Sequence, residues 1–65
     1  MIVCETSEQN TAMHTASKLA WKFGQHTFVY KRTRNGVRRF LVTDKHLEKT
    51  DQRERLERIA HFGRA

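Results

Sequence analysis

This sequence of 65 residues has no proline, one cysteine and no long hydrophobic run, and each lack excludes a class of protein. The single Cys4 can form no intramolecular disulfide and has no second cysteine at metal-ligand spacing, so the covalent and metal supports of small secreted domains are missing. A reducing, cytoplasmic setting is therefore expected. The first residues, Met1 to Glu5, are too few and too weakly apolar for a signal peptide or a membrane span. We expect a soluble protein that does not contact membranes.

Motifs for catalysis and for cofactors are lacking as well. The sequence has no glycine-rich phosphate loop, no His-x-x-x-His pair and no serine in a nucleophile elbow. His14, His26, His46 and His61 could in principle meet Cys4 around zinc, but their spacings match no zinc finger or ribbon. So short a chain also leaves little core in which to build a catalytic pocket. We expect no enzymatic activity, no metal and no cofactor.

What the sequence has in abundance is positive charge. Thirteen Lys and Arg residues stand against seven Asp and Glu, giving a formal net charge of +6. Residues 18–45 hold eight of these cations and one acid, Asp44, so the middle of the chain carries the whole excess. A positive field of this kind attracts polyanions, namely nucleic acid, an acidic protein surface or anionic lipid.

The N-terminal third of the chain predicts a helix. Apolar residues recur at helical spacing up to about residue 23 and form a stripe wide enough to face a core. Ser7 or Asn10 could serve as the N-cap, and Gly24 follows as a C-terminal stop. Ile2 and Val3 favour a strand, so a short strand before the helix is an option.

The centre of the chain predicts a β-hairpin. Two runs rich in β-branched and aromatic residues flank Asn35-Gly36, the pair that most favours a two-residue type I′ turn. This turn would place Arg32 opposite Arg39 on one face of the hairpin. The base of the hairpin would then be apolar on both faces, and the tip basic on both. We expect helices to bury the base and residues 31–39 to project into solvent as a charged arm.

The C-terminal part of the chain predicts a second helix, after a break near residues 44–49. Acidic residues precede basic ones by four positions, as in Glu54 and Arg58, which is typical of a solvated helix face. The apolar residues that cluster on a helical wheel are Leu56, Ile59, Ala60 and Phe62. A helix over about residues 51–62 follows from this pattern.

The hairpin tip carries the main functional signal. Its cationic residues are Lys31, Arg32, Arg34, Arg38 and Arg39. Arginine suits bidentate contact with phosphate or guanine, and a two-stranded ribbon fits the major groove of DNA. Like charges that face each other, as Arg32 and Arg39 would, destabilise an isolated ribbon, so an anionic partner would relieve the repulsion. The alternative is that the charges only prevent the hairpin from pairing with other sheets.

Trp21 is the second informative residue, because it lies away from the apolar stripe of the predicted helix. It stands between Lys18 and Lys22. In the exposed state it could stack on a base or anchor a protein interface. The alternative is that Trp21 packs under the C-terminal helix or the N-terminal strand and gives the first helix a second buried face.

The stretch from Gly36 to Asp44 resembles the wing and following helix start of small phage excisionases and related winged-helix DNA-binding proteins. The shared features are a Gly-x-Arg-Arg-aromatic strand and an Asp that opens a helix. Residues 19–24 are similar to the first helix and turn of a helix-turn-helix. The resemblance implies a recognition helix over residues 27–34, ended by Asn35-Gly36.

Together these patterns predict one α+β domain over residues 1–65, built as helix, β-hairpin and helix. The favoured function is binding of DNA or RNA, as in a phage or mobile-element regulator. The tip cations would contact phosphates, and Lys18 and Lys22 would extend the binding surface. The alternative is a non-enzymatic inhibitor or adaptor whose arm docks on an acidic protein while Trp21 anchors the interface. A homodimer that shares a sheet at the hairpin base is a further option.

Overall fold

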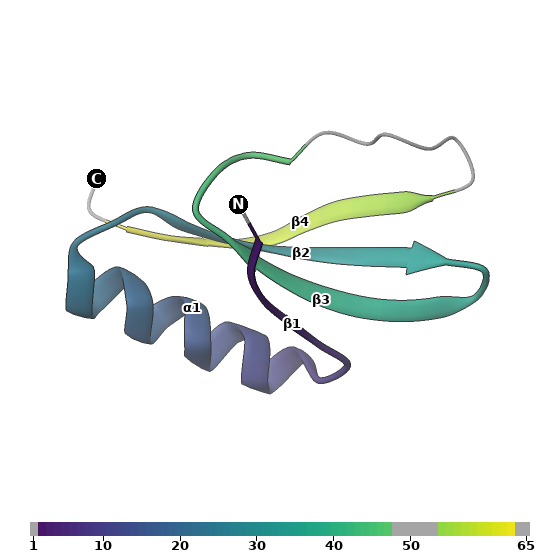
Figure 1. The fold of residues 1–65 in the computed structure, drawn as a ribbon, viewed down its shortest axis with the longest axis horizontal. Helices are drawn as coiled ribbons and strands as arrows, with labels where there is room; N and C mark the ends of the chain where they lie inside the picture. Colours follow the sequence, from purple (N-terminus) through teal and green to yellow (C-terminus); the bar gives the residue numbers. More distant parts are fainter. Residues whose placement is uncertain (1, 48–53, 64–65) are drawn as a thin grey trace.

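The computed structural model describes residues 2–47 and 54–63 and confirms the α+β class. The elements are β1 (Ile2–Thr6), α1 (Gln9–Phe23), β2 (Thr27–Arg34), β3 (Val37–Thr43) and β4 (Arg55–Phe62). The four strands form one antiparallel sheet in the order β1-β3-β2-β4. Figure 1 shows α1 lying along one face of this sheet. The short N-terminal strand, left as an option by the sequence, is therefore present.

The predicted first helix is confirmed as α1, although its N-cap differs. The N-cap is Glu8 and not Ser7 or Asn10. Gly24 ends the helix in the left-handed conformation, with φ of 64°, and its backbone N–H donates to the carbonyl oxygen of Ala20 at 2.9 Å. α1 has 15 residues, and nowhere in the described ranges is a helix both long and apolar enough to cross a membrane.

The hairpin and its register are confirmed, but it is not a free arm. Asn35 and Gly36 have φ of 52° and 76°, as a type I′ turn requires, and Arg32 lies opposite Arg39. β1 pairs with the outer edge of β3, and β4 pairs with the outer edge of β2. The hairpin is thus the centre of the sheet. A dimer that shares this sheet would have to join at the outer edge of β1 or β4.

The core on the helix-side face of the sheet is narrow and uses small helix residues. Ala12 and Ala16 are fully buried against Val29, Phe40 and Val42. Alanine at both positions lets the α1 backbone approach the sheet closely, so the bulk of this core comes from the strands. This packing fixes which face of each strand points toward α1, because side chains alternate along a strand.

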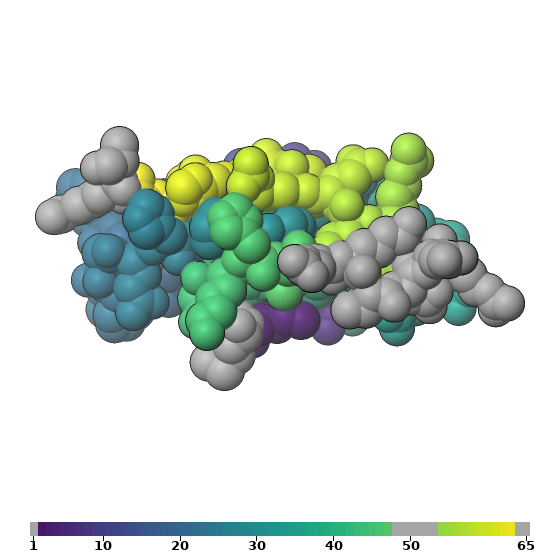
Figure 2. All heavy atoms as spheres, turned by 90° about the horizontal axis from the view of Figure 1, so that it is seen from above, coloured from purple at the N-terminus to yellow at the C-terminus, as the bar shows by residue number. Residues whose placement is uncertain are grey.

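In the described ranges, the far face of the sheet is covered by residues 44–47, which follow β3, with a β4 side chain packed beside them, and not by a second helix. Phe28, Tyr30 and Leu41 form a buried cluster there, with Leu47 and Leu56 packed on it. The backbone N–H of Leu47 donates to the Tyr30 hydroxyl at 3.1 Å. Figure 2 looks onto this side of the molecule, where residues 44–47 appear in green. The expectation that helices bury both faces of the hairpin base is therefore wrong.

The predicted C-terminal helix is also wrong, because its described part forms β4. A register shift opposite Val29 and Tyr30 inserts an extra residue in β4, so Ile59 and Ala60 both contribute to the helix-side core. That bulge breaks the alternation of period two and leaves an apolar spacing that resembles a helix. Pairing with β2 along the full strand outweighs the local helical preference. The beginning of the predicted helix, and the end of the predicted break over 44–49, lie outside the described residues.

The recognition helix that the excisionase resemblance implies is not found. Residues 27–34 form β2, whose aromatic and β-branched residues at 27–30 are buried in the sheet. Asp44 and Lys45 are bends, residues 46 and 47 are irregular, and no helix begins in this described segment. The resemblance therefore does not extend to the fold.

Candidate functional site

The candidate site is the tip of the β2-β3 hairpin, residues 31–39, which extends past the first turn of α1 (Figure 1). Neither face of the tip is covered by the helix. Because Val29 and Phe40 point toward α1, alternation along the strands assigns each tip cation to a face. The helix-side face holds Lys31 and Arg38, and the far face holds Arg32, Arg34 and Arg39.

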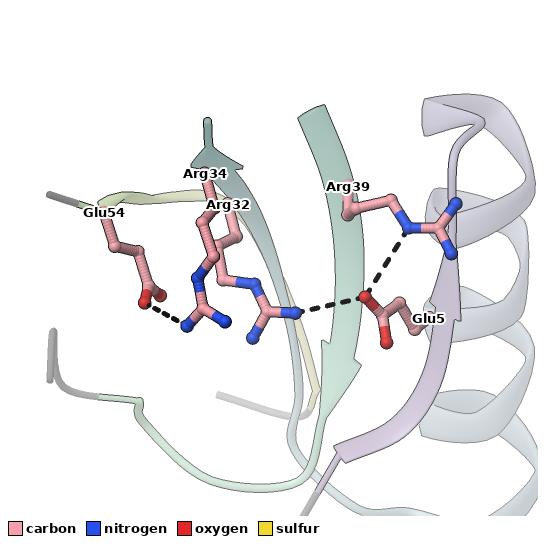
Figure 3. A network of polar contacts seen from close by, with 5 residues as sticks. All are labelled: Glu5, Arg32, Arg34, Arg39 and Glu54. Atoms are coloured by element: carbon pink, nitrogen blue, oxygen red, sulfur yellow. Dashed lines mark hydrogen bonds and ion pairs between the residues drawn. The ribbon is translucent and has the colours of Figure 1, made fainter. Parts of the chain in front are cut away.

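On the far face, two of the arginines share one acid from the neighbouring strand. Glu5 of β1 accepts from Nη2 of Arg32 at 3.1 Å and lies 3.6 Å from Nε of Arg39 (Figure 3). Arg32 and Arg39 face each other across the hairpin, as expected, and the Glu5 carboxylate offsets their repulsion. This acid was not predicted from the sequence, because the pairing of β1 with β3 brings together residues more than 25 positions apart.

Arg34, beside the turn, is held by a buried acid. Its Nη2 donates to Oε2 of Glu54 at 2.9 Å (Figure 3). Glu54 is only 5% exposed, whereas the Arg34 side chain is 52% exposed. A charge-assisted hydrogen bond of this length stabilises a buried carboxylate that would otherwise be costly. Glu54 was expected to face solvent on a helix, so its role at the tip was also missed.

The helix-side face of the tip is less neutralised. Glu57 of β4 lies 3.5 Å from Nζ of Lys31 and 3.2 Å from Nε of Arg55. Arg38 forms no ion pair with any residue in the described part of the chain. Of the described residues on this face, three are cations and one, Glu57, is a carboxylate, which Lys31 and Arg55 share. Arg55 was not among the predicted site residues, because a helix would have placed it far from the hairpin.

The cations of the helix-side face line a hollow of about 500 Å³. Ser7, just before α1, forms one wall, and Gly36 of the turn lies at the outer end. Thr33 occupies the middle of the strand surface between the charged side chains. The hollow can accept an anion, since cationic and hydroxyl groups dominate its lining.

Trp21, Lys18 and Lys22 lie at the other end of the molecule. Figure 1 shows the C-terminal end of α1 at the far end of the molecule from the hairpin tip. These lysines therefore do not lie beside the cations of the tip. Trp21 is 91% exposed, and the alternative in which it is buried is wrong. Together with Ala20 and Phe62 it lines a second hollow of about 300 Å³.

Three of the histidines gather at the base of the sheet and pack with an aromatic ring. Nδ1 of His26 lies 3.0 Å from Nε2 of His61, and the His61 ring stacks on Phe28 with centroids 4.6 Å apart. The His46 ring also lies against Phe28, at 4.3 Å. Over the described residues, no three His, Cys, Asp or Glu side chains converge in a way that could hold a metal ion.

Searches with this chain match no protein-family model, no curated protein and no solved structure.

Proposed function

We propose that this protein binds nucleic acid through phosphate groups at the hairpin tip. The observation that carries the proposal is the charge ratio there: among the residues that the structure describes, six cations face three acids. The cations are Lys31, Arg32, Arg34, Arg38, Arg39 and Arg55, and the acids are Glu5, Glu54 and Glu57. This excess lies at one end of an elongated molecule, which extends 34 Å along its longest axis. A localised positive field of this kind attracts polyanions.

The ion pairs of the tip are compatible with phosphate binding. Pairs between exposed charges typically contribute about 0.2–1 kcal/mol, so a phosphate can compete with a glutamate for a guanidinium group. Before a phosphate binds, the glutamates hold the arginine side chains in place on the strands. Arginine also presents several N–H donors in a planar fork that suits phosphate oxygens.

The width of the tip favours contact with the phosphate backbone over reading of bases. β4 accompanies β2 as far as the Thr33–Arg55 pair, so the sheet is three strands wide where the cations lie. Adjacent strands are about 4.7–4.9 Å apart, and a major groove about 12 Å wide admits two strands with their side chains. We therefore propose binding with little sequence preference.

The test is fluorescence anisotropy with labelled random-sequence duplex DNA, single-stranded DNA and RNA at several salt concentrations. The affinity for at least one of the three is expected to fall as salt rises, with a slope of about −0.9 per phosphate for duplex DNA or about −0.7 for single strands. The control variant Lys18→Gln/Lys22→Gln removes two charges at the far end and is expected to bind nearly as well. Absence of binding to all three at low ionic strength would contradict the proposal.

A second candidate function is the docking of a protein partner, and Trp21 is the observation that favours it. A 91% exposed tryptophan beside an apolar hollow is typical of an interface anchor. Lys18 and Lys22 flank it, so an acidic partner surface would suit this end. The protein would then act as a non-enzymatic inhibitor or adaptor.

The two functions can be separated with Trp21 itself, because it is the single tryptophan of the chain. Nucleic acid bound at the hairpin tip is expected to leave its emission unchanged, whereas a protein docked at the α1 end should shift it to shorter wavelength. A stoichiometric protein complex that survives nuclease treatment and is lost on Trp21→Ala would favour the second function.

A further inference from the structure

The two faces of the hairpin tip differ in how completely their cations are neutralised. On the far face, every arginine contacts a carboxylate, either Glu5 or Glu54. On the helix-side face, Lys31 and Arg55 share Glu57, and Arg38 forms no ion pair with a described residue. The helix-side face is therefore the one with cationic groups available to an external anion.

Strand register places two arginines around a hydroxyl on the helix-side face. Thr33 of β2 lies directly opposite Arg38 of β3 on one side and Arg55 of β4 on the other. Side chains directly opposite each other share a face, with Cβ atoms about 4.5–5.5 Å apart. Thr33 thus lies between two arginines in one row across three strands, and all three residues line the hollow of about 500 Å³.

The contacts within this row leave donors available. Arg55 meets Glu57 through Nε, and its side chain is 80% exposed, so its terminal nitrogens can turn toward the hollow. Lys31 lies in the next row, opposite Glu57, and adds positive charge behind Thr33. Ser7 contributes a hydroxyl from the wall formed by the start of α1.

We propose that this row, Arg38-Thr33-Arg55, binds one phosphate group in the hollow. The two guanidinium groups donate to phosphate oxygens from opposite sides, the Thr33 hydroxyl donates between them, and Lys31 adds to the field. The inference rests on the proposed function in taking a nucleic-acid phosphodiester as the source of that phosphate. The far-face arginines then serve mainly to hold β1 and the residue before β4 against the hairpin.

The first experiment compares three variants that each remove two positive charges. Arg38→Gln/Arg55→Gln is expected to weaken oligonucleotide binding at least about tenfold and, because the row holds one phosphate, to make the salt slope shallower by about one. Arg32→Gln/Arg39→Gln on the far face should lose clearly less, and Lys18→Gln/Lys22→Gln least. Circular dichroism checks that each variant is folded. An equal or larger loss from the far-face variant would overturn the assignment to the row.

The second experiment uses changes that separate charge from hydrogen bonding. Glu57→Gln removes the carboxylate that faces the hollow and is expected to tighten binding, whereas Glu5→Gln, the matched change on the far face, should have a smaller effect. Thr33→Val preserves shape and charge but removes the hydroxyl, so the affinity should fall a few-fold with an unchanged salt slope. Tighter binding by Glu5→Gln than by Glu57→Gln would contradict the proposal.

A titration with inorganic phosphate, followed by the NMR shifts of the Thr33 and Arg38 amides, separates this inference from the proposed function. Shifts at both amides without oligonucleotide binding would retain the row as a site for free phosphate and reject nucleic-acid binding. Oligonucleotide binding that is insensitive to Arg38→Gln/Arg55→Gln would retain the function and reject the row. If the two amides do not shift and no oligonucleotide binds, both the row and the proposed function are rejected.

Discussion

The base and the tip of the β2-β3 hairpin belong to the same two strands but have opposite environments. At the base, residues 27–30 and 40–43 are buried on both faces, by α1 on one and by Leu47 and Leu56 on the other. At the tip, most side chains are charged and at least partly exposed, and they are joined by ion pairs. The boundary falls between Tyr30 and Lys31 on β2 and between Arg39 and Phe40 on β3.

This difference separates stability from binding within one hairpin. Burial of apolar surface contributes about 25 cal/mol per Å², so the base supplies most of the favourable free energy of the sheet. Surface ion pairs contribute little by comparison. Residues of the tip can therefore bind a partner with little effect on folding. Substitutions at the base should lower stability, and substitutions at the tip should weaken binding.

The largest expected effect comes from a matched pair of valines on β3. Val42 is fully buried at the base, whereas Val37 is 57% exposed at the tip. Val42→Ala is expected to lower the free energy of unfolding by about 1.5–3 kcal/mol, because it removes buried methyl groups and leaves a cavity. Val37→Ala should cost less than about 1 kcal/mol, the span of strand propensities. Urea denaturation followed by circular dichroism measures both, and equal losses would refute the division between base and tip.

The turn is the one place at the tip where backbone conformation is expected to limit stability. Gly36 has φ of 76°, and a Cβ added there would meet no neighbouring atom. Gly36→Ala should therefore cost about 1–2 kcal/mol through left-handed strain alone. Gly36→Asn should cost less, because Asn tolerates this conformation. Thermal unfolding of the two variants gives the comparison, and a neutral Gly36→Ala would show that the turn does not depend on a positive φ.

Glu54 is expected to give an intermediate effect, because it is a buried acid within the exposed tip. Glu54→Gln keeps the size of the side chain but replaces the charged acceptor of the Arg34 hydrogen bond with a neutral amide oxygen. Charge-assisted hydrogen bonds are about twice as strong as neutral ones, so we expect a loss of about 1 kcal/mol in the free energy of unfolding. Glu8→Gln, at an exposed N-cap, is the control. A loss for Glu54→Gln no larger than that for the control would indicate that the negative charge of Glu54 adds little to its contact with Arg34.

The smallest expected effect is the coupling between Glu5 and Arg32. A double-mutant cycle with Glu5→Gln and Arg32→Gln should give about 0.2–1 kcal/mol, as for other partly exposed pairs. The coupling should decrease as salt rises, because screening weakens the interaction of exposed charges. Chemical denaturation with urea, which adds no ions, is the appropriate measurement. A coupling above that range would show that ion pairs at the tip contribute more to the stability of the sheet than expected.

The parts of the candidate site that depend on neighbouring residues were predictable from the sequence. Asn35-Gly36 fixes the turn, and the turn fixes the register, so the positions of Arg32, Arg38 and Arg39 on the strands followed at once. α1 likewise followed from helical periodicity and from Gly24 as its stop. These features rest on contacts between residues a few positions apart.

The acids that pair with the cations of the tip could not be predicted in the same way. Glu5 and Glu57 reach the tip because β1 and β4 add to opposite edges of the hairpin, and Glu54 reaches it just before β4. In the sequence, the segment over 55–62 has an apolar spacing close to that of a helix, because the bulge at Ile59 and Ala60 interrupts strict alternation. Arg55 was missed for the same reason.

The sequence by itself therefore determined the first helix, the hairpin, its register and its concentration of arginine, since turn chemistry and periodicity act over short distances along the chain. Only the tertiary structure decided which strands flank the hairpin, which arginines are neutralised and which face of the tip stays available. That choice depends on pairing between residues 22 to 41 positions apart, where burial of apolar residues on both faces of the sheet outweighs local helical preference.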